Sequence, residues 1–190
     1  MTTAAPAIPG YKTGTWTIDA VHSEVGFSVR HMMVSKVRGR FGRFSGTVVT
    51  GPQVTDSSVT ATIELDSIDT NNEQRDGHIK SADFFNVEQH PTMTYRSTSI
   101  TPTGEGSFRV DGELTLKGVT RNVPLSLELG GFGPDAYGGY RVGFSATAEI
   151  NRSQFGVDIS MPMETGGVVL GEKVSISLEI EAVLDTAAAA

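Results

Sequence analysis

The sequence contains no cysteine, which excludes disulfides, thiol chemistry and cysteine-ligated metals and leaves the compartment undetermined by cysteine usage. It also lacks any apolar run near the roughly 20 residues that a transmembrane helix requires. The first residues, MTTAAPAIPGYKTG, have neither the basic start nor the apolar stretch of a signal peptide. We therefore expect a soluble protein that stays in the cytoplasm if Met1 is its native start.

Positive charge is scarce as well. The chain has 15 Lys and Arg against 22 Asp and Glu, which gives a formal net charge of −7. A surface of this sign repels phosphate backbones, so nucleic acid is not expected as a partner. For the chain as a whole, the same balance disfavours membrane-surface binding through basic residues. At 190 residues the chain is about the size of one large domain with a substantial core.

What the sequence does contain is hydrophobic alternation with a period of two, the pattern of β-strands that have one dry and one wet face. Besides the alternating segments, two strands are expected at about 38–50 and 92–100. The first should contain a bulge or kink between Phe41 and Phe44, because glycines lie there and the apolar positions change from odd to even numbers. The apolar positions of the alternating segments are Trp16 and Ile18; Val25, Phe27 and Val29; Val59, Ala61, Ile63 and Leu65; Phe108, Val110, Leu114 and Leu116; Val123, Leu125, Leu127 and Leu129; Val142, Phe144, Ala146, Ala148 and Ile150; and Val174, Ile176, Leu178 and Ile180.

Turn and helix signals separate these segments. Residues 117–122 predict a hairpin loop, and the glycine-rich residues 130–139 predict the connection of the next strand pair. A helix is expected only at about 72–82, with Asn71 or Asn72 as its N-cap. This helix is a candidate lid or plug.

The outward positions are Ser, Thr, Glu and Arg, so the apolar faces are expected to point inward. Long strands of this kind fit an up-and-down barrel, and about eight strands leave an interior that side chains fill or that holds one ligand. We predict an all-β fold, an extended antiparallel closed β-barrel of about eight strands with one or two short helices. Residues 1–14 are expected to be a flexible lead-in, 15–184 a single barrel domain, and 185–190 a disordered tail.

Charged and titratable residues leave several interpretations open. The basic cluster Arg30, Lys36, Arg38, Arg40 and Arg43 is either a mouth for an anionic head group such as phosphate or a solvated face. The four histidines do not share the spacing of a metal site, so neither a metal nor a cofactor is predicted. His31 or His78 could serve as an acid–base group inside a barrel, which keeps an enzyme among the alternatives.

Short motifs along almost the whole chain, from about Trp16 to Leu184, resemble the YceI-like family in that family's order. They are DAVHS at 19–23 followed by Phe27, Val29 and His31; Gly39, Phe41, Phe44 and Gly46; RDGHIKSADFFNVEQHPTMTYRS at 75–97; LTLKGVTRNVPLSL at 114–127; and INRSQFGV at 150–157. The resemblance implies a lipocalin-like barrel that binds a polyisoprenoid or a similar long amphiphile in a central pocket. It also implies a homodimer, and many relatives are periplasmic. The family has no well-established catalytic residues.

We therefore predict a protein that carries, stores or sequesters an isoprenoid quinone or a polyprenyl phosphate, and that is not an enzyme. The alternatives are a lipid-modifying enzyme that uses His31 or His78, and a packed barrel that serves as a protein-interaction module. Inward parity and the family motifs give the expected ligand-binding residues, which are Phe27, Val29, Phe41, Ile63, His78, Ile79, Phe84, Phe85, Met93, Tyr95, Leu114, Leu116, Leu125, Leu127, Phe144, Phe155, Ile176 and Leu178.

Overall fold

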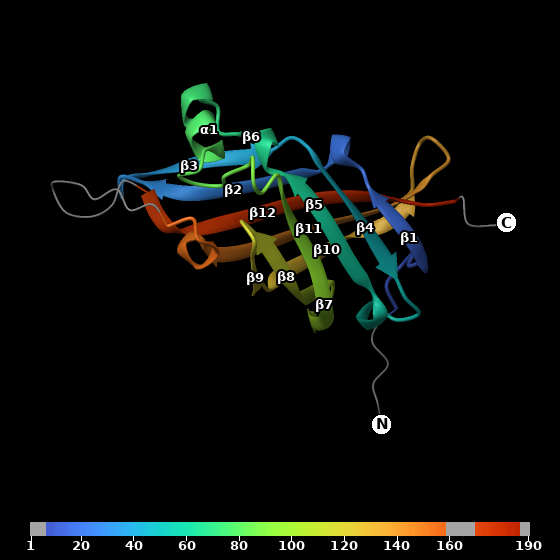
Figure 1. Cartoon of the computed structure of the whole chain (residues 1–190). Coiled ribbons are helices and arrows are strands. Elements are labelled where there is room, and N and C mark those ends of the chain that lie inside the picture. The colour runs from blue at the N-terminus through green and yellow to red at the C-terminus, as the bar shows by residue number, and fades with distance from the viewer. Residues whose placement is uncertain (1–6, 159–169, 187–190) are drawn as a thin grey trace.

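The computed structural model describes residues 7–158 and 170–186, and within them the chain is almost entirely β-sheet (Figure 1). One α-helix, α1, spans Glu73–Lys80. The strands are β1 Gly14–Ile18, β2 Glu24–His31, β3 Ser35–Phe41, β4 Phe44–Thr50, β5 Ser58–Glu64, β6 Ile68–Asp69, β7 Thr92–Gly104, β8 Ser107–Leu116, β9 Val119–Asn122, β10 Leu125–Pro134, β11 Tyr140–Asn151 and β12 Leu170–Leu184. No helix of the described residues has the length and apolarity needed to cross a bilayer.

Eight strands close into an antiparallel barrel, as predicted. The hydrogen-bonded order is β1–β4–β5–β7–β8–β10–β11–β12, and the pairing of β12 with β1, for example Leu184 with Trp16, completes the ring. The order follows the chain with neighbours mostly adjacent in sequence, which is the up-and-down arrangement. Closure gives each of these eight strands a partner on both sides, whereas β6 and β9, each of which pairs with one described strand, lie outside the ring.

Three neighbouring strands are interrupted at nearly the same level of the barrel wall. Short 3₁₀ turns separate β1 from β2 (Ala20–His22) and β5 from β6 (Leu65–Ser67), and two residues separate β3 from β4. A hydrogen bond from Gly42 N–H to the Ser67 carbonyl (3.0 Å) joins two of these breaks. Beyond the breaks, β2 pairs with residues 170–179 of β12, and β3 and β6 follow, so the sheet continues past the ring of eight strands.

The connections differ from the sequence prediction in three places. The strand expected at 38–50 is broken completely, because β3 pairs with β2 and β6 whereas β4, a separate strand, pairs with β1 and β5. The expected loop 117–122 shrinks to the turn Lys117–Gly118, and both residues have a positive φ (52° and 76°). The glycine-rich segment 130–139 is not all loop, since β10 continues through it to Pro134 with a bulge between Leu129 and Gly131.

A small aromatic core closes the narrow end of the barrel. Trp16 is fully buried there, together with Val48, Val142 and Ala182. The Trp16 indole N–H donates to Thr50 Oγ1 (2.9 Å), and that hydroxyl donates to the Lys12 carbonyl (2.7 Å). Each buried polar atom of this group is therefore satisfied, as burial requires.

Residues just before β1 pack over this same end. Tyr11 donates its hydroxyl hydrogen to the Gly51 carbonyl (2.8 Å), and Tyr140 donates to the Gly10 carbonyl (2.6 Å). The Tyr11 ring also meets Phe132 edge-on, with centroids 5.3 Å apart. The sequence predicts a flexible lead-in over 1–14, whereas residues 10–12 are held by these contacts; residues 1–6 and 187–190 lie outside the described residues.

Helix α1 and the turns after it lie at the opposite, wider end. Asn72 is the N-cap, one of the two asparagines that the sequence offered, and its side-chain oxygen accepts from Arg75 N–H (2.9 Å). The residues after the helix return through tight turns, with Asn86 in the left-handed region (φ 51°). This element brings the apolar side chains of Ile79, Phe84 and Phe85 to the barrel interior.

Candidate functional site

An apolar cavity of about 340 Å³ lies inside the barrel. This volume falls within the range of about 300–1,000 Å³ typical of small-molecule sites. Side chains from β2, β3, β5, β7, β8, β10, β11 and β12 form its wall, and residues of α1 and the following turns close it at the wider end. The interior of this barrel is therefore a cavity and not a completely filled core.

The predicted site residues nearly all lie in the wall of this cavity, with Phe155 as the exception. Phe155 is 1% exposed and packs in the main core cluster, in a 3₁₀ turn after β11, without reaching the cavity surface. Whether the lining residues contact a lipid stays a prediction. The lining includes Phe27, Val29, Phe41, Ile63, His78, Ile79, Phe84, Phe85, Met93, Tyr95, Leu114, Leu116, Leu125, Leu127, Phe144, Ile176 and Leu178.

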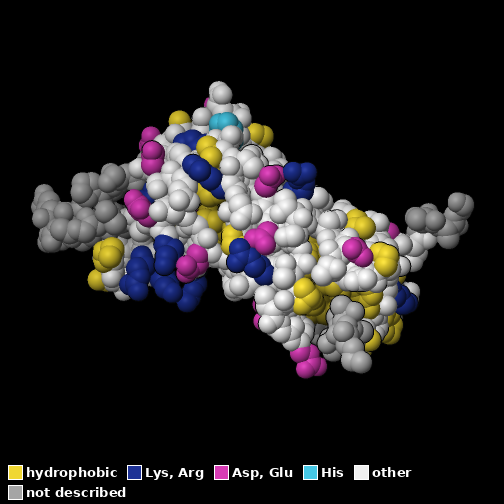
Figure 2. Space-filling model, turned by 90° about the horizontal axis from the view of Figure 1, so that it is seen from below, with side chains coloured by type: hydrophobic (Ala, Val, Ile, Leu, Met, Phe, Trp, Pro, Cys, Tyr) yellow, Lys and Arg dark blue, Asp and Glu magenta, His cyan; other side chains and the backbone are white. Residues whose placement is uncertain are grey.

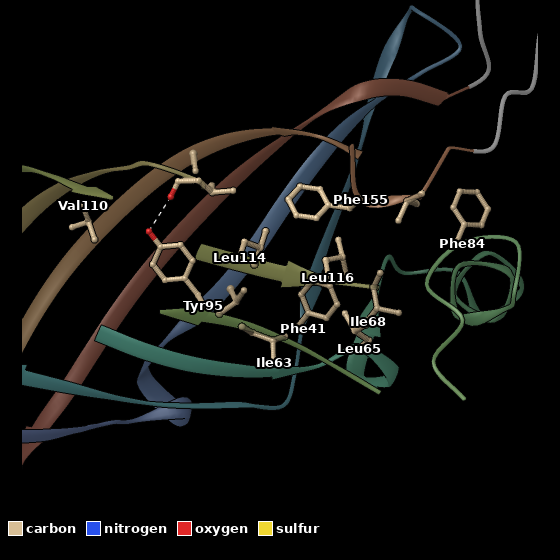
Figure 3. Close-up of a cluster of buried hydrophobic side chains, with 14 residues drawn as sticks. Phe41, Ile63, Leu65, Ile68, Phe84, Tyr95, Val110, Leu114, Leu116 and Phe155 are labelled. Carbon is tan, nitrogen blue, oxygen red and sulfur yellow. Dashed lines mark hydrogen bonds between the residues drawn. The ribbon is translucent and has the colours of Figure 1, made fainter. Parts of the chain in front are cut away.

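Several of these side chains converge from different strands. Figure 3 shows Phe41, Ile63 and Leu116 pointing into the same interior space, with Tyr95 and Leu114 further along the barrel. The Tyr95 hydroxyl donates to the Val123 carbonyl (2.9 Å), at the break between β9 and β10. Burial raises the pKa of the Tyr95 phenol above its usual range, so the phenol stays neutral and keeps this hydrogen bond.

Two glycines make room for aromatic rings in the wall. The Phe27 ring lies over Gly39, its cross-strand partner, and the Tyr95 ring lies over Gly112. A Cβ at either glycine would collide with the ring. Small residues opposite large ones thus set how far the aromatic groups extend into the interior.

Aromatic contacts connect the segment around α1 to the barrel wall. The Phe27 and Phe41 ring centroids are 5.6 Å apart, and those of Phe41 and Phe85 are 6.4 Å apart. The Phe84 ring meets the His78 ring edge-on at 5.0 Å. These contacts seat α1 and its turns on the cavity, which is the position that the sequence suggested for a lid or plug.

Few polar groups face the cavity, and hydrogen bonds within the protein position several of them, among them Thr70, Arg75 and Arg152. Arg152 is 7% exposed, and its guanidinium donates to the carbonyls of Gly171 (2.8 Å), Val157 (2.8 Å) and Leu170 (3.1 Å). Burial lowers the pKa of Arg152, while Glu172 and Asp158 act in the opposite direction. Three of its five N–H groups are used in this way, so it can still donate to an acceptor inside the cavity.

A second arginine reaches the cavity from α1. Arg75 donates through Nε to Thr70 Oγ1 (2.8 Å) and through Nη2 to the Thr70 carbonyl (2.5 Å). The Thr70 hydroxyl in turn donates to Asp76 (2.5 Å), so helix, threonine and carboxylate form one network. Thr70 is 2% exposed, which places this network at the cavity wall and not in bulk water.

The two histidines proposed as acid–base groups both line the cavity. His31 ends β2, and His78 lies in the last turn of α1 with Nε2 3.0 Å from Asp83 Oδ2. The side chain of His78 is 46% exposed, so this pair sits at the margin of the cavity. The structure does not bring His31 and His78 into a direct hydrogen bond within the described residues.

The residues that sequence reasoning missed carried a usable signal. Thr70 follows Ile68 by two positions and Arg152 follows Ile150 by two, so inward parity continues from each apolar residue to the polar one. Arg75 could not be found in this way, because it lies on the helix. The cavity also includes apolar residues that were expected to point inward but were not assigned to the site, such as Val25, Val110 and Ile180.

A cluster of charged groups near the narrow end is an internal ion network. Asp19, His22 and Glu181 have the donor types of a cation site, but the Arg141 guanidinium lies 2.7 Å from Asp19, 2.8 Å from Asp135 and 3.6 Å from Glu181. Arg141 and His22 hold the pKa of the Asp19 carboxyl well below its usual range. The guanidinium supplies the positive charge that a metal would otherwise bring.

Comparison with known proteins agrees with this architecture. A family model described as a YceI-like domain matches residues 16–182. A UPF0312 protein of Staphylococcus aureus (strain N315) is 37% identical over 170 residues, covering 87% of this chain and 95% of that protein.

Solved structures show the same fold. BcnA of Burkholderia cenocepacia aligns with a TM-score of 0.76 at 24% identity, covering 86% of this chain and 98% of that one. A polyisoprenoid binding domain from Saccharophagus degradans, described as implicated in plant cell wall breakdown, aligns with a TM-score of 0.69 at 15% identity, covering 92% and 100% of the two chains. At these identities the likeness concerns the fold.

Proposed function

Since this chain belongs to the YceI-like family, we propose that it binds a long-chain isoprenoid lipid inside the barrel and carries, stores or sequesters it. The observation that carries the proposal is the cavity of about 340 Å³ inside the barrel, with an almost wholly apolar wall. The polyisoprenoid-binding description of the S. degradans domain, which has the same fold, points to the same ligand class. The proposal includes no catalytic step.

Apolar burial supplies enough free energy for such a complex. Each buried methylene contributes about 0.8 kcal/mol, so about twenty enclosed carbons contribute roughly 16 kcal/mol. Association costs about 4–15 kcal/mol in lost freedom. A site built in this way binds without many polar contacts, and it discriminates weakly between chains that differ by one methylene.

The polar groups of the cavity wall favour a ligand with an anionic or strongly accepting head group. Arg152 donates only to backbone carbonyls among the described residues, and the carboxylates Glu172 and Asp158 favour its charge without accepting a hydrogen bond from it. A phosphate or quinone oxygen near Arg152 would accept from its remaining N–H groups. We therefore propose an isoprenoid quinone or a polyprenyl phosphate as the ligand class.

Uptake of defined ligands tests this proposal. Any co-purified lipid is first removed from the protein with a buffer saturated with organic solvent. The protein is then incubated with a prenyl quinone, a prenyl phosphate, or a saturated fatty alcohol of similar length. Retention of a prenyl compound at a one-to-one ratio after gel filtration supports the proposal, and failure to retain any of them contradicts it. Sedimentation velocity of the same samples tests the homodimer, which we propose from the family resemblance alone.

A further inference from the structure

The outer face of the β2–β3 hairpin is basic, and this face takes no part in the cavity. Arg30, Lys36 and Arg38 are exposed on outward positions, where Arg30 lies directly opposite Lys36. Arg40 pairs with Asp69 at 3.6 Å, and Arg43 pairs with Glu64 and Asp66. Within residues 7–158 and 170–186, Arg30, Lys36 and Arg38 form no ion pair. The five-residue basic cluster of the sequence thus divides into two paired arginines and three unpaired cations.

Nothing nearby in the sequence offsets these charges. No Asp or Glu occurs between Val25 and Thr55, although the chain has 22 acidic residues in total. Like charges directly opposite each other on a hairpin, as in the Arg30–Lys36 pair, destabilise it. The net charge of −7 therefore does not describe this face, which is locally positive at a cost to folding stability.

The tip of the same hairpin is apolar and exposed. Met32, Met33 and Val34 are 43%, 53% and 85% exposed. Met32 and Met33 both have a positive φ (50° and 61°), and Val34 N–H donates to the His31 carbonyl (3.2 Å), which is the geometry of a type I′ turn. Asn-Gly is the sequence that such turns prefer, so two methionines here cost backbone strain and place apolar surface in water.

The inner face of the hairpin belongs to the cavity. Val29, His31 and Val37 line it, so the basic face, the apolar tip and one wall of the cavity are parts of two adjacent strands. Figure 2 shows Lys and Arg side chains gathered beside a small hydrophobic group at the left end of the molecule, the end at which Figure 1 places this hairpin. Apolar side chains flanked by cations are the combination that binds an anionic lipid surface.

We propose that the β2–β3 hairpin docks on anionic membranes. The tip residues Met32, Met33 and Val34 enter the boundary between head groups and acyl chains, and Arg30, Lys36 and Arg38 contact anionic head groups. Docking in this orientation turns the wider end of the barrel toward the bilayer. The inference goes beyond the proposed cargo, because docking requires only the outer face and the tip.

Vesicle flotation of the full chain tests the proposal. Vesicles of phosphatidylcholine alone are compared with vesicles that also contain phosphatidylglycerol, at low and at high salt. Binding is expected only to the anionic vesicles and is expected to weaken with salt, because screening shortens the reach of the surface potential. The triple variant Arg30→Ser, Lys36→Ser, Arg38→Ser should lower the partition coefficient on the order of a hundredfold, about fivefold for each cation.

Two further variants separate docking from a structural role. Arg96→Ser, Arg109→Ser, Arg121→Ser removes three exposed cations from β7, β8 and β9, and it should bind the anionic vesicles as the unmodified chain does. Met32→Asn, Met33→Gly gives the turn its preferred residues, so it should raise the melting temperature while weakening vesicle binding several-fold. If Met32 and Met33 affected only the stability of the hairpin, the more stable variant would bind vesicles more strongly and not more weakly.

The outcomes separate docking from cargo binding. Equal binding to neutral and anionic vesicles, no binding to either, or full binding by the Arg30, Lys36 and Arg38 variant overturns the docking proposal. Salt-sensitive binding by a chain that takes up no prenyl compound supports docking and rejects the proposed cargo. Prenyl uptake without vesicle binding rejects docking alone.

Discussion

A carboxylate placed at Leu127 gives a quantitative test of whether a ligand fills the cavity. Leu127 lies on β10, lines the cavity and is only partly buried, because it faces that space. Glutamate is of similar size, so Leu127→Glu should fold, with the carboxylate solvated by water in the empty cavity. A bound prenyl chain removes this water, and the carboxyl group must then become neutral or prevent binding.

The cost of neutralising the carboxyl group sets the size of the effect. An unperturbed Glu has a pKa of about 4.3, and each pH unit above it costs about 1.4 kcal/mol to protonate the group. At about pH 7.5 the penalty is roughly 4.4 kcal/mol, a loss of about three orders of magnitude in affinity. At about pH 5.5 it falls to roughly 1.6 kcal/mol, or about fifteenfold.

The assay is a titration with fluorescently labelled geranylgeraniol at several pH values. Two matched controls isolate the effect. Leu127→Gln has the same shape without the charge and should lose affinity by an amount that does not change with pH. Ser126→Glu places the carboxylate on the next residue of β10, which is exposed and faces outward, and should bind normally. Normal binding by Leu127→Glu, or an equal loss in Ser126→Glu, would refute the assignment of the ligand to this cavity.

Three further predictions concern the framework around the cavity. Trp16→Phe removes the indole donor to Thr50 from a fully buried site, so the free energy of unfolding in urea should fall by about 1–3 kcal/mol while prenyl binding is unchanged; an unchanged unfolding midpoint would contradict this. Tyr95→Phe should lower stability by about 1 kcal/mol at neutral pH. Because burial raises the pKa of the Tyr95 phenol in the folded state, the unmodified protein should also lose stability as the pH rises above about 10, and the variant should lose less; parallel alkaline profiles would exclude this. Arg141 and His22 lower the pKa of Asp19, so its contribution is present above the ordinary carboxyl pKa and is lost as the pH falls below it. Asp19→Asn should therefore be less stable at neutral pH and show a shallower acid decline in thermal melts, whereas an acid profile identical to that of the unmodified chain would argue against the network.

The fold was predictable because alternation fixes which face of each strand is dry. A shift of one residue would move every side chain to the other face, so the parity read along segments such as Val174–Ile180 also identifies most of the cavity wall. The helix was predictable from the adjacent asparagines and the loss of alternation, and the structure selects Asn72 over Asn71 as its N-cap. These features depend on residues close together in the sequence.

The breaks in the wall and the cavity itself depend on contacts between distant residues. The interruption between β3 and β4 is joined to Ser67 through Gly42, a contact that no local pattern indicates. Whether the interior is open depends on how side chains from eight strands fill it, and pairs such as Tyr95 over Gly112 become visible only once the register is known. The sequence alone could not show that Arg43, unlike Arg30, Lys36 and Arg38, is held in ion pairs. Its partners Glu64 and Asp66 are more than twenty residues away along the chain.

The central claim is that the barrel encloses an isoprenoid lipid, and the most direct test is native mass spectrometry of freshly purified protein followed by analysis of its organic extract. The account predicts a one-to-one adduct whose extracted mass contains repeated prenyl units, and predicts its absence from Leu127→Glu isolated in parallel at neutral pH. A protein that carries no adduct and also takes up neither added prenyl quinone nor prenyl phosphate would contradict the claim.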